Sequence, residues 1–407
     1  MGRGERFWIG AVFFITAAGP GCWMPVLSNV ITDRGWGAWI TVAFMLPQIA
    51  GIISPLILGA KADQKYAAEK VLAIIFALGS VAMFAAFWAL SHAENPLWFL
   101  GFMMLNSLIS APAWSLITTI ALSNLNEKGD NFGFFRVWGT IGWMVAGWLV
   151  SALSLDHSAN AGILAAGLRM LGVLAALQLP KTPPKGTSKG TWRSALGFDS
   201  LVMLKDRDQA VYFATCFFFV MPISAFYMHT PIQLAGLGLD DVALGMSIGQ
   251  AVEMLAMLTM GMVMVRMRVK WMLIIAMVCG SMRFVFYALG AHYNSVFWVL
   301  TGVAMQGICY PFFFETGRVF VNRRTPIGLK AQTQALLGFV SGGIGGLAGT
   351  VVVGALYQSI VVKGSGSWVN YWLILGGFST ASLVFFAALY RGIPVPAEEL
   401  RGETGAK

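Results

Sequence analysis

The sequence predicts an all-α integral membrane protein with twelve transmembrane helices arranged as two six-helix halves. Of its 407 residues, 57% are hydrophobic and only 11% are charged, whereas about 25% of residues are charged in soluble domains. The apolar stretches are each about 20 residues or longer, which is enough to cross a hydrocarbon core of ~30 Å. Because these runs are long and uninterrupted, they exclude a β-barrel, and helices remain as the way to satisfy the backbone in lipid.

The first half is predicted to contain six helices, and helix-breaking or polar residues occur inside three of them. The first is interrupted by GPGCWMP, from Gly19 to Pro25, which is typical of a helix that lines a cavity or packs closely. The fourth has a polar middle with Asn106 and Pro112, and the sixth carries Arg169. The predicted helices span residues 7–31, 36–60, 71–90, 97–122, 134–155 and 161–179.

A polar stretch at residues 180–208 divides the apolar chain in two. Six more helices are predicted after it, at 209–232, 242–265, 271–289, 296–321, 331–362 and 368–390. We therefore expect an N-terminal half at 1–179, a cytoplasmic linker loop at 180–208, a C-terminal half at 209–390 and a cytoplasmic tail at 391–407. Two halves joined by a long loop are typical of secondary transporters.

The placement of charge predicts the topology. The formal net charge is +9, but nearly all Lys and Arg fall in alternate connections between helices. By the positive-inside rule, both termini and the long loop are expected in the cytoplasm, in a multi-pass protein of the cell (cytoplasmic or inner) membrane. The same placement excludes a nucleic-acid partner, since the excess charge follows the topology. No cleavable signal peptide is expected, because the apolar run from Phe7 flows into the fold.

Two short patterns give candidate functional residues near the cytoplasmic side. Gly59-x-x-x-Asp63 resembles the loop signature of the major facilitator superfamily, in which the aspartate helps to hold one conformation; a solvated turn is the alternative. In NFGFFRVWGTIGW, Arg136, Thr140 and Trp143 share one face of a helix. A cation, a hydroxyl and an indole there could meet a polar, ring-shaped solute, whereas the alternative for Arg136 is a cytoplasmic anchor.

Acids inside apolar helices are the candidates for proton coupling. Gln250 and Glu253 lie three residues apart on one helical face, which could bind a solute or form a structural hydrogen bond. Glu315 and Arg318 are also three apart, so they could neutralise each other. Pro311 predicts a bend one turn before Glu315. Glu253 and Glu315 are the acids placed to exchange a proton.

No enzyme constellation is visible in the sequence. The four histidines form no metal-ligand pair, and no nucleophile elbow or phosphate loop is present. The four cysteines lie in apolar segments without metal-ligand or redox spacing. We therefore expect neither catalysis nor a cofactor nor a bound metal.

The chain resembles the nucleoside:proton symporter family of the major facilitator superfamily over nearly its whole length. The R-x-W-G-T-I-G run is similar to that family's fifth-helix stretch, and Ser247-x-x-Gln250-x-x-Glu253 resembles its S-x-x-Q-x-x-E segment. Weaker similarities occur at LGAKAD (58–63), MLNSLISAP (104–112), MRFVFYALG (282–290) and GRVFV (317–321).

The resemblance implies a site. Arg136, Thr140 and Trp143 would line a nucleoside-binding cavity, with Trp143 where the family has phenylalanine, and Gln250 and Glu253 would hold sugar hydroxyls or the base. The sequence departs from the family in two helices.

Pro311 stands where the family has an acid, so Glu315 is our candidate for that role. In the seventh helix no match to the family's Gln and Asn pair is found; Ser224, Tyr227 and His229 are available, and we include Tyr227 in the predicted site.

The sequence thus predicts proton-coupled nucleoside import by alternating access. The alternative is a proton-coupled symporter of another polar solute, such as a sugar, a sugar acid or a peptidoglycan fragment. The expected partners are a small polar solute, protons and the lipid bilayer, and nothing in the sequence demands more than a monomer.

Overall fold

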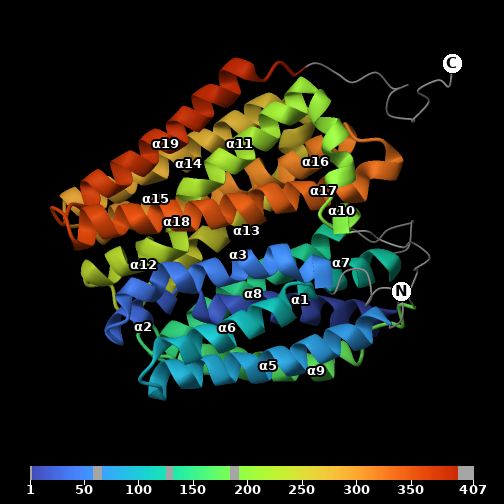
Figure 1. Ribbon diagram of the computed structural model, residues 1–407. Coiled ribbons are helices and arrows are strands. Elements are labelled where there is room, and N and C mark those ends of the chain that lie inside the picture. Colours follow the sequence, from blue (N-terminus) through green and yellow to red (C-terminus); the bar gives the residue numbers. More distant parts are fainter. Residues whose placement is uncertain (1, 58–66, 125–131, 184–191, 393–407) are drawn as a thin grey trace. The chain divides into compact units, whose positions relative to one another are not determined.

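The computed structural model describes residues 2–57, 67–124, 132–183 and 192–392, and within these ranges it contains helices and no strand (Figure 1). Ten helices of the described chain are long and apolar enough to cross a membrane. Two further helices, α8 (Phe132–Ala152) and α9 (Asn160–Ala176), lie where the fifth and sixth spans were predicted. The prediction of an all-α membrane protein with twelve spans is confirmed.

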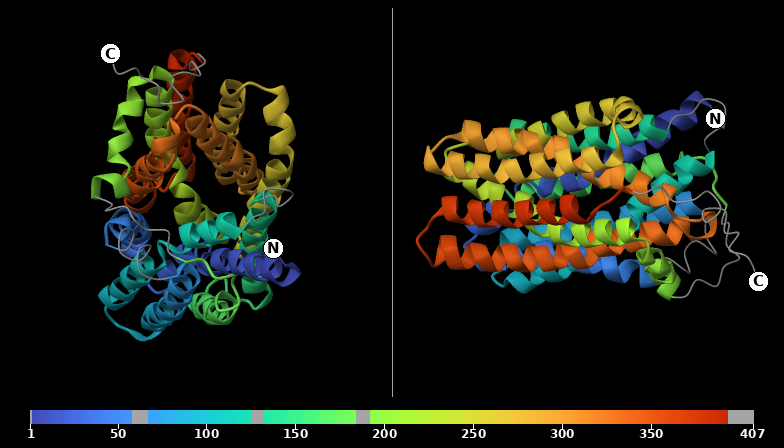
Figure 2. Two further views of the ribbon diagram at one scale, coloured as in Figure 1. Left: turned by 90° about the vertical axis from the view of Figure 1, so that its right-hand side faces the viewer. Right: turned by 90° about the horizontal axis from the view of Figure 1, so that it is seen from above.

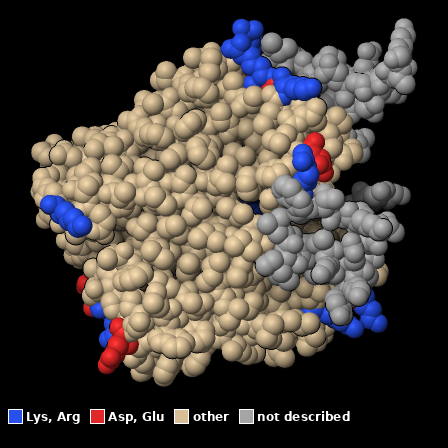
Figure 3. Space-filling model, in the orientation of Figure 1, with Lys and Arg blue, Asp and Glu red and all other residues tan. Residues whose placement is uncertain are grey.

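The helices group into two compact units, which are described separately. Unit 1 comprises Met1–Lys189 and Phe226–Met254, and unit 2 comprises Gly190–Ala225 and Leu255–Lys407. Within each unit the axes of the long helices are roughly aligned (Figure 2). Charged side chains on the face drawn in Figure 3 lie near its margins and leave the middle uncharged, as expected for helices that meet lipid.

Unit 1 is built from the described helices of residues 1–189, including α8 and α9, together with α12 and the first half of α13. Its other elements are α1 (Arg3–Trp23), α2 (Leu27–Asp33), η1 (Gly37–Trp39), α3 (Ile40–Ile57), α5 (Ala68–His92), α6 (Pro96–Ser110) and α7 (Ala113–Asn124). α12 is Ala225–Gly236 and α13 is Val242–Arg266.

Prolines account for the interruptions in the first and fourth predicted spans. Pro25 lies in the turn between α1 and α2, and Pro112 lies between α6 and α7. Because proline has no backbone N–H, the helical hydrogen-bond ladder is interrupted there. The start of α6 is fixed locally by Asn95, whose side chain accepts a hydrogen bond from the Leu97 N–H at 2.9 Å.

Helix α1 is the centre of unit 1 and packs against α8 and α9, while α5 packs against α6 and α9. The core between them contains fully buried Phe13 and Phe76. A Cβ atom on Gly142 of α8 would overlap the Phe14 carbonyl oxygen of α1, and one on Gly21 would lie 3.0 Å from the Trp143 backbone. The two helices therefore touch backbone to backbone, as glycine permits in membrane helix pairs.

Unit 2 contains the remaining helices, and two of its long apolar helices include π-helical segments. Its elements are α10 (Trp192–Ala195), η2 (Phe198–Lys205), α11 (Arg207–Ile223), the second half of α13, α14 (Val269–His292), α15 (Val296–Tyr310), η3 (Pro311–Glu315), α16 (Thr316–Arg323), η4 (Ile327–Leu329), α17 (Lys330–Gly338), η5 (Phe339–Gly345), α18 (Gly346–Tyr357), η6 (Gln358–Val362) and α19 (Trp368–Leu389). The π-helical segments are η3, η5 and η6.

A charge cluster joins the start of α11 to the end of α16. The Arg324 guanidinium lies 2.8 Å from a carboxylate oxygen of Asp206 and 3.1 Å from one of Asp208. Asp206 also caps α11 by accepting the Gln209 N–H at 2.9 Å. Asp208 is almost fully buried, so Arg324 supplies the charge that its burial requires.

Candidate functional site

Three predicted residues from three different helices meet inside unit 1. The rings of Trp143 (α8) and Tyr227 (α12) have centroids 5.6 Å apart and planes tilted by 43°. The Gln250 side-chain amide (α13) donates a hydrogen bond to the Tyr227 hydroxyl oxygen at 3.2 Å. The result is an indole, a phenol and an amide within one cluster, which is a combination that can stack on a ring and hydrogen-bond its substituents.

The packing of α13 against α8 places Gln250 in this cluster. Trp148 Nε1 donates a hydrogen bond to Ser247 Oγ at 2.9 Å, one turn before Gln250. A Cβ atom on Gly147 would lie 2.9 Å from the Ala243 carbonyl oxygen, so α8 and α13 also approach closely through glycine. Glu253 follows Gln250 by three residues and is half-buried. The spacing puts the carboxyl group one turn along from the cluster.

Arg136 lies at the other end of the predicted α8 face. Its guanidinium carbon sits 4.8 Å from the centroid of the Trp114 ring of α7, which is a cation–π contact. Thr140 is half-buried between Arg136 and Trp143 on the same face. The structure therefore places Arg136 against an aromatic wall inside unit 1. Its partner Trp114 was missed by sequence reasoning, because the contact joins two helices.

Glu315 belongs to unit 2 and ends the π-helical segment η3. Arg318 Nη1 lies 3.1 Å from Glu315 Oε1, so the two side chains form the ion pair that was one of the sequence alternatives. A bend was expected at Pro311, and the structure has the π-helical segment η3 beginning there. The Tyr212 hydroxyl donates to the Phe313 carbonyl at 3.2 Å, which satisfies a backbone oxygen in this widened turn. Proton coupling by Glu315 stays a prediction, as does the predicted role of Gly59 and Asp63, which lie outside the described residues.

Asp156, in the turn between α8 and α9, binds the start of α13. Its carboxylate accepts the Ala243 N–H at 2.6 Å and the Ser151 hydroxyl at 3.0 Å, and Ser151 Oγ in turn accepts the Leu244 N–H at 3.0 Å. Two N–H groups that lack a partner within the first turn of α13 are thus satisfied from another segment. Burial raises the pKa of Asp156 above its ordinary value, and the hydrogen bonds from Ala243 and Ser151 oppose that shift.

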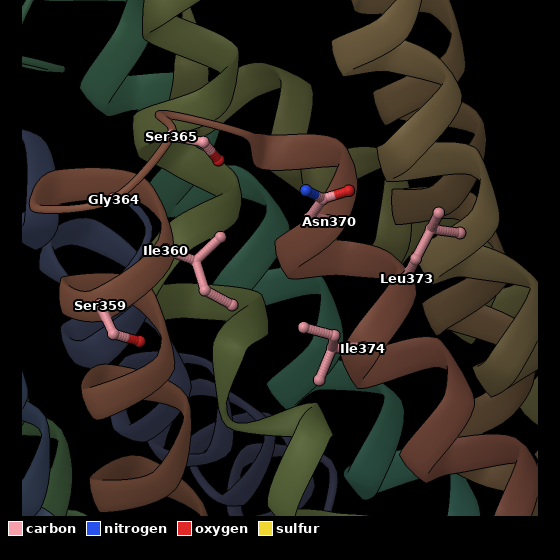
Figure 4. A pocket seen from close by; sticks show the side chains of 7 residues that line it. All are labelled: Ser359, Ile360, Gly364, Ser365, Asn370, Leu373 and Ile374. Atoms are coloured by element: carbon pink, nitrogen blue, oxygen red, sulfur yellow. The ribbon is translucent and has the colours of Figure 1, made fainter.

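The lining of a cavity of about 600 Å³ in unit 2 contains none of the predicted residues. Figure 4 shows its lining at the turn between η6 and α19, with Ser359, Ser365 and Asn370 as its polar side chains. Leu373 and Ile374 on its wall are about half exposed. No charged side chain lines it, so it offers no group for proton coupling.

Comparison with known proteins assigns the family. The model of the nucleoside H+ symporter family matches residues 7–393. The chain belongs to this family. It is 27% identical over 401 residues to the nucleoside permease NupG of Escherichia coli, covering 92% of this chain and 94% of that protein. It is 26% identical over 394 residues to the xanthosine permease of the same organism, with coverages of 92% and 93%.

Solved structures agree with the family assignment. A crystal structure of a mutant form of the nucleoside transporter NupG superposes with a TM-score of 0.84, at 25% identity, over 95% of this chain and 100% of that one. The chain has the major facilitator fold and is a transporter, not an enzyme.

Proposed function

We propose that this nucleoside H+ symporter family member imports nucleosides together with protons by alternating access. The observation that carries the site assignment is the cluster of Trp143, Tyr227 and Gln250, which three helices build from residues far apart in the chain. The aromatic rings would stack on the base or cover the sugar. Gln250 and Glu253 would bind hydroxyls or base edges, and Arg136 and Thr140 would complete the polar side.

Glu253 is our first choice for the proton-coupling group. A carboxyl group that alternates between a desolvated site and water changes its proton affinity, which is the physical requirement for coupling. Glu315 is our second choice, because its carboxylate already forms an ion pair with the Arg318 guanidinium at 3.1 Å.

The first experiment measures uptake of labelled uridine and adenosine by cells that lack their own nucleoside carriers. We expect uptake above that of cells without the protein, and loss of accumulation when a protonophore collapses the proton gradient. Absence of uptake, with the protein shown to be in the membrane, would contradict the nucleoside assignment and favour the alternative of another polar solute.

The second experiment separates coupling from binding. Glu253→Gln is expected to abolish proton-driven accumulation while substrate exchange across the membrane persists, because the amide keeps the shape but cannot titrate. Glu94→Gln, at an exposed position between α5 and α6, is the control and should accumulate normally. Normal accumulation by Glu253→Gln would refute the coupling role.

Arg136 has a separate test in the same assay. Arg136→Ala should raise the half-saturating nucleoside concentration about tenfold, since a hydrogen bond to a charged group contributes ~1.5–3 kcal/mol. An unchanged value would make Arg136 an anchor at the membrane surface.

The proposal extends to topology and assembly. The distribution of Lys and Arg supports an inner-membrane protein with both termini in the cytoplasm. The proposed halves, 1–179 and 209–390, are separated by the polar stretch at 180–208, and the proposed assembly is a monomer. Cysteine labelling from either side of intact cells tests the orientation. Labelling of residue 3 or 400 from outside would contradict it.

A further inference from the structure

A second cavity, of about 320 Å³, lies entirely within unit 1 and contains a buried cation. Helices α1, α3, α5, α6, α7 and α9 all contribute to its wall. Its polar and aromatic lining consists of Thr16, Trp23, Asn106, Ser107, Ser110, Trp114 and Arg169. Trp143, Tyr227 and Gln250 do not line it, so it is a separate feature from the cluster described above.

Arg169 is the charged group of this cavity, and its side chain is held firmly in place. It is only 6% exposed. Nη1 donates to Asn106 Oδ1 at 2.6 Å, and Nη2 donates to Ser110 Oγ at 2.5 Å. Cβ atoms on Gly19 and Gly79 would each lie 3.4 Å from atoms of the arginine side chain, so glycines make room for it.

The charge of Arg169 lacks a compensating anion within the described part of the chain. Both of its hydrogen-bond partners are neutral, and no described carboxylate forms an ion pair with it. A guanidinium has five N–H donors, of which two are accounted for here. Buried charges in membrane proteins are normally paired, so an unpaired one beside a cavity favours an anionic ligand.

A second donor in the cavity wall is also unsatisfied. Trp23 is 5% exposed, and its Nε1–H has no hydrogen-bond partner among the described residues. On another part of the wall, the Trp114 ring makes its cation–π contact with the Arg136 guanidinium. The cavity therefore combines two indole rings with a fixed guanidinium, and it adjoins the predicted nucleoside site through Trp114.

We propose that this cavity is a subsite for a planar anionic group of the transported solute. A carboxylate or an ionised heterocycle matches the flat, two-pronged donor geometry of a guanidinium, and the indoles provide faces for a ring. This inference rests on the proposed transport function and adds solutes that carry such a group to its substrate class.

The test measures binding to the purified protein in nanodiscs by calorimetry, without a proton gradient. The probes are xanthosine, whose purine ring is ionised near neutral pH, its neutral analogue inosine, and D-glucuronate, a sugar carboxylate; uridine reports on the neutral nucleoside site. At about pH 7.5 we expect xanthosine or glucuronate to bind at least ~10-fold more tightly than inosine. The two anions distinguish an ionised base from a sugar acid as the natural source of the charge.

The decisive variant is Asn106→Asp, which places a carboxylate on the Arg169 guanidinium with almost no change in shape. It should bring the affinity for the anions down to that for inosine while leaving uridine binding unchanged. Ser110→Asp compensates the same charge from its other partner and gives a second chance if the first variant is poorly folded.

The matched control is Gln306→Glu in unit 2. There the fully buried Arg283 donates to the Gln306 amide oxygen in the same manner, but neither residue lines this cavity. The control variant should keep the wild-type preference for anions.

Three outcomes would overturn the inference: no preference for either anion in the wild type, an equal loss of uridine binding in Asn106→Asp, or an equal loss of anion preference in Gln306→Glu. The result for transport is separate. Failure of uridine uptake combined with anion binding that depends on Asn106 would refute nucleoside transport and support the subsite. Uridine uptake without anion preference would support nucleoside transport and refute the subsite.

Discussion

The bond between Asp156 and the start of α13 makes a quantitative prediction. Replacing Asp156 by alanine removes the acceptor for the Ala243 N–H at 2.6 Å and for the Ser151 hydroxyl at 3.0 Å. Ala243 is 1% exposed, so water cannot replace the lost partner. Leaving a buried donor unsatisfied costs ~1–3 kcal/mol, and loss of a helix cap typically costs ~1 kcal/mol.

The burial of the carboxylate offsets part of this loss. Because burial raises the pKa of Asp156, the folded protein disfavours the charged carboxylate. Removing the carboxylate removes this unfavourable contribution to the free energy of folding. We therefore expect a net cost of about 2 kcal/mol for Asp156→Ala, or about 2–3 °C in the unfolding midpoint of this 407-residue chain. Amide exchange of Ala243 and Leu244 should accelerate about 30-fold.

The pH dependence of stability is an independent test of the raised pKa of Asp156. With a folded-state pKa above the ordinary 3.8, Asp156 binds its proton more tightly in the folded protein. Its contribution to stability therefore falls as pH rises from about 3.8 through the raised pKa, and is constant above it. Asp156→Asn keeps an acceptor but cannot titrate, so it should be at least as stable as the wild type at neutral pH and should lose this slope.

Thermal unfolding in nanodiscs and hydrogen exchange measure these effects. Asp240→Ala, at an exposed position three residues before Ala243, is the control. If Asp156→Ala and Asp240→Ala unfolded at the same temperature and exchanged at the same rate, the assigned cap would be incorrect.

Two further substitutions test the packing of each unit. Gly142→Ala should strongly reduce the yield of folded protein, since its Cβ would overlap the backbone of α1. The control Gly167→Ala, with no atom within 4 Å of the new Cβ, should be neutral or stabilising by up to ~1 kcal/mol. Equal yields of the two variants would refute the close crossing of α1 and α8. Arg324→Met should destabilise by ~3 kcal/mol because it removes the cation that pairs with the buried carboxylate of Asp208. Arg193→Met, which breaks an exposed pair at 3.9 Å, should cost ~1 kcal/mol or less, and thermal unfolding of the two variants decides between them.

Hydrophobic run lengths were sufficient to predict the order of all twelve spans. The interruption at Pro25 was also predictable, because a missing N–H has the same local effect in every helix. The interruption at Pro112 was not predicted, since that proline was noted only as part of a polar middle. The π-turns were not predictable. Pro311 indicated a bend in the tenth span, but an apolar run has no periodicity that separates an α-turn from a π-turn.

The candidate site was predictable along single helices and not between them. The spacing of Arg136, Thr140 and Trp143 shows that they share a face, and the same holds for Gln250 and Glu253. That Trp143 and Gln250 meet through Tyr227 depends on how α8, α12 and α13 pack. A single sequence contains no information on such distant pairings beyond the resemblance to a family.

The backbone contact between α1 and α8 has a practical consequence for spectroscopy. The two helices pack backbone against backbone at Gly142 and Gly21, so they cannot shift along each other without steric overlap. Distances between probes attached to the outer faces of these two helices should stay constant through a transport cycle. The pair can therefore serve as the fixed reference for measuring movements of the other helices.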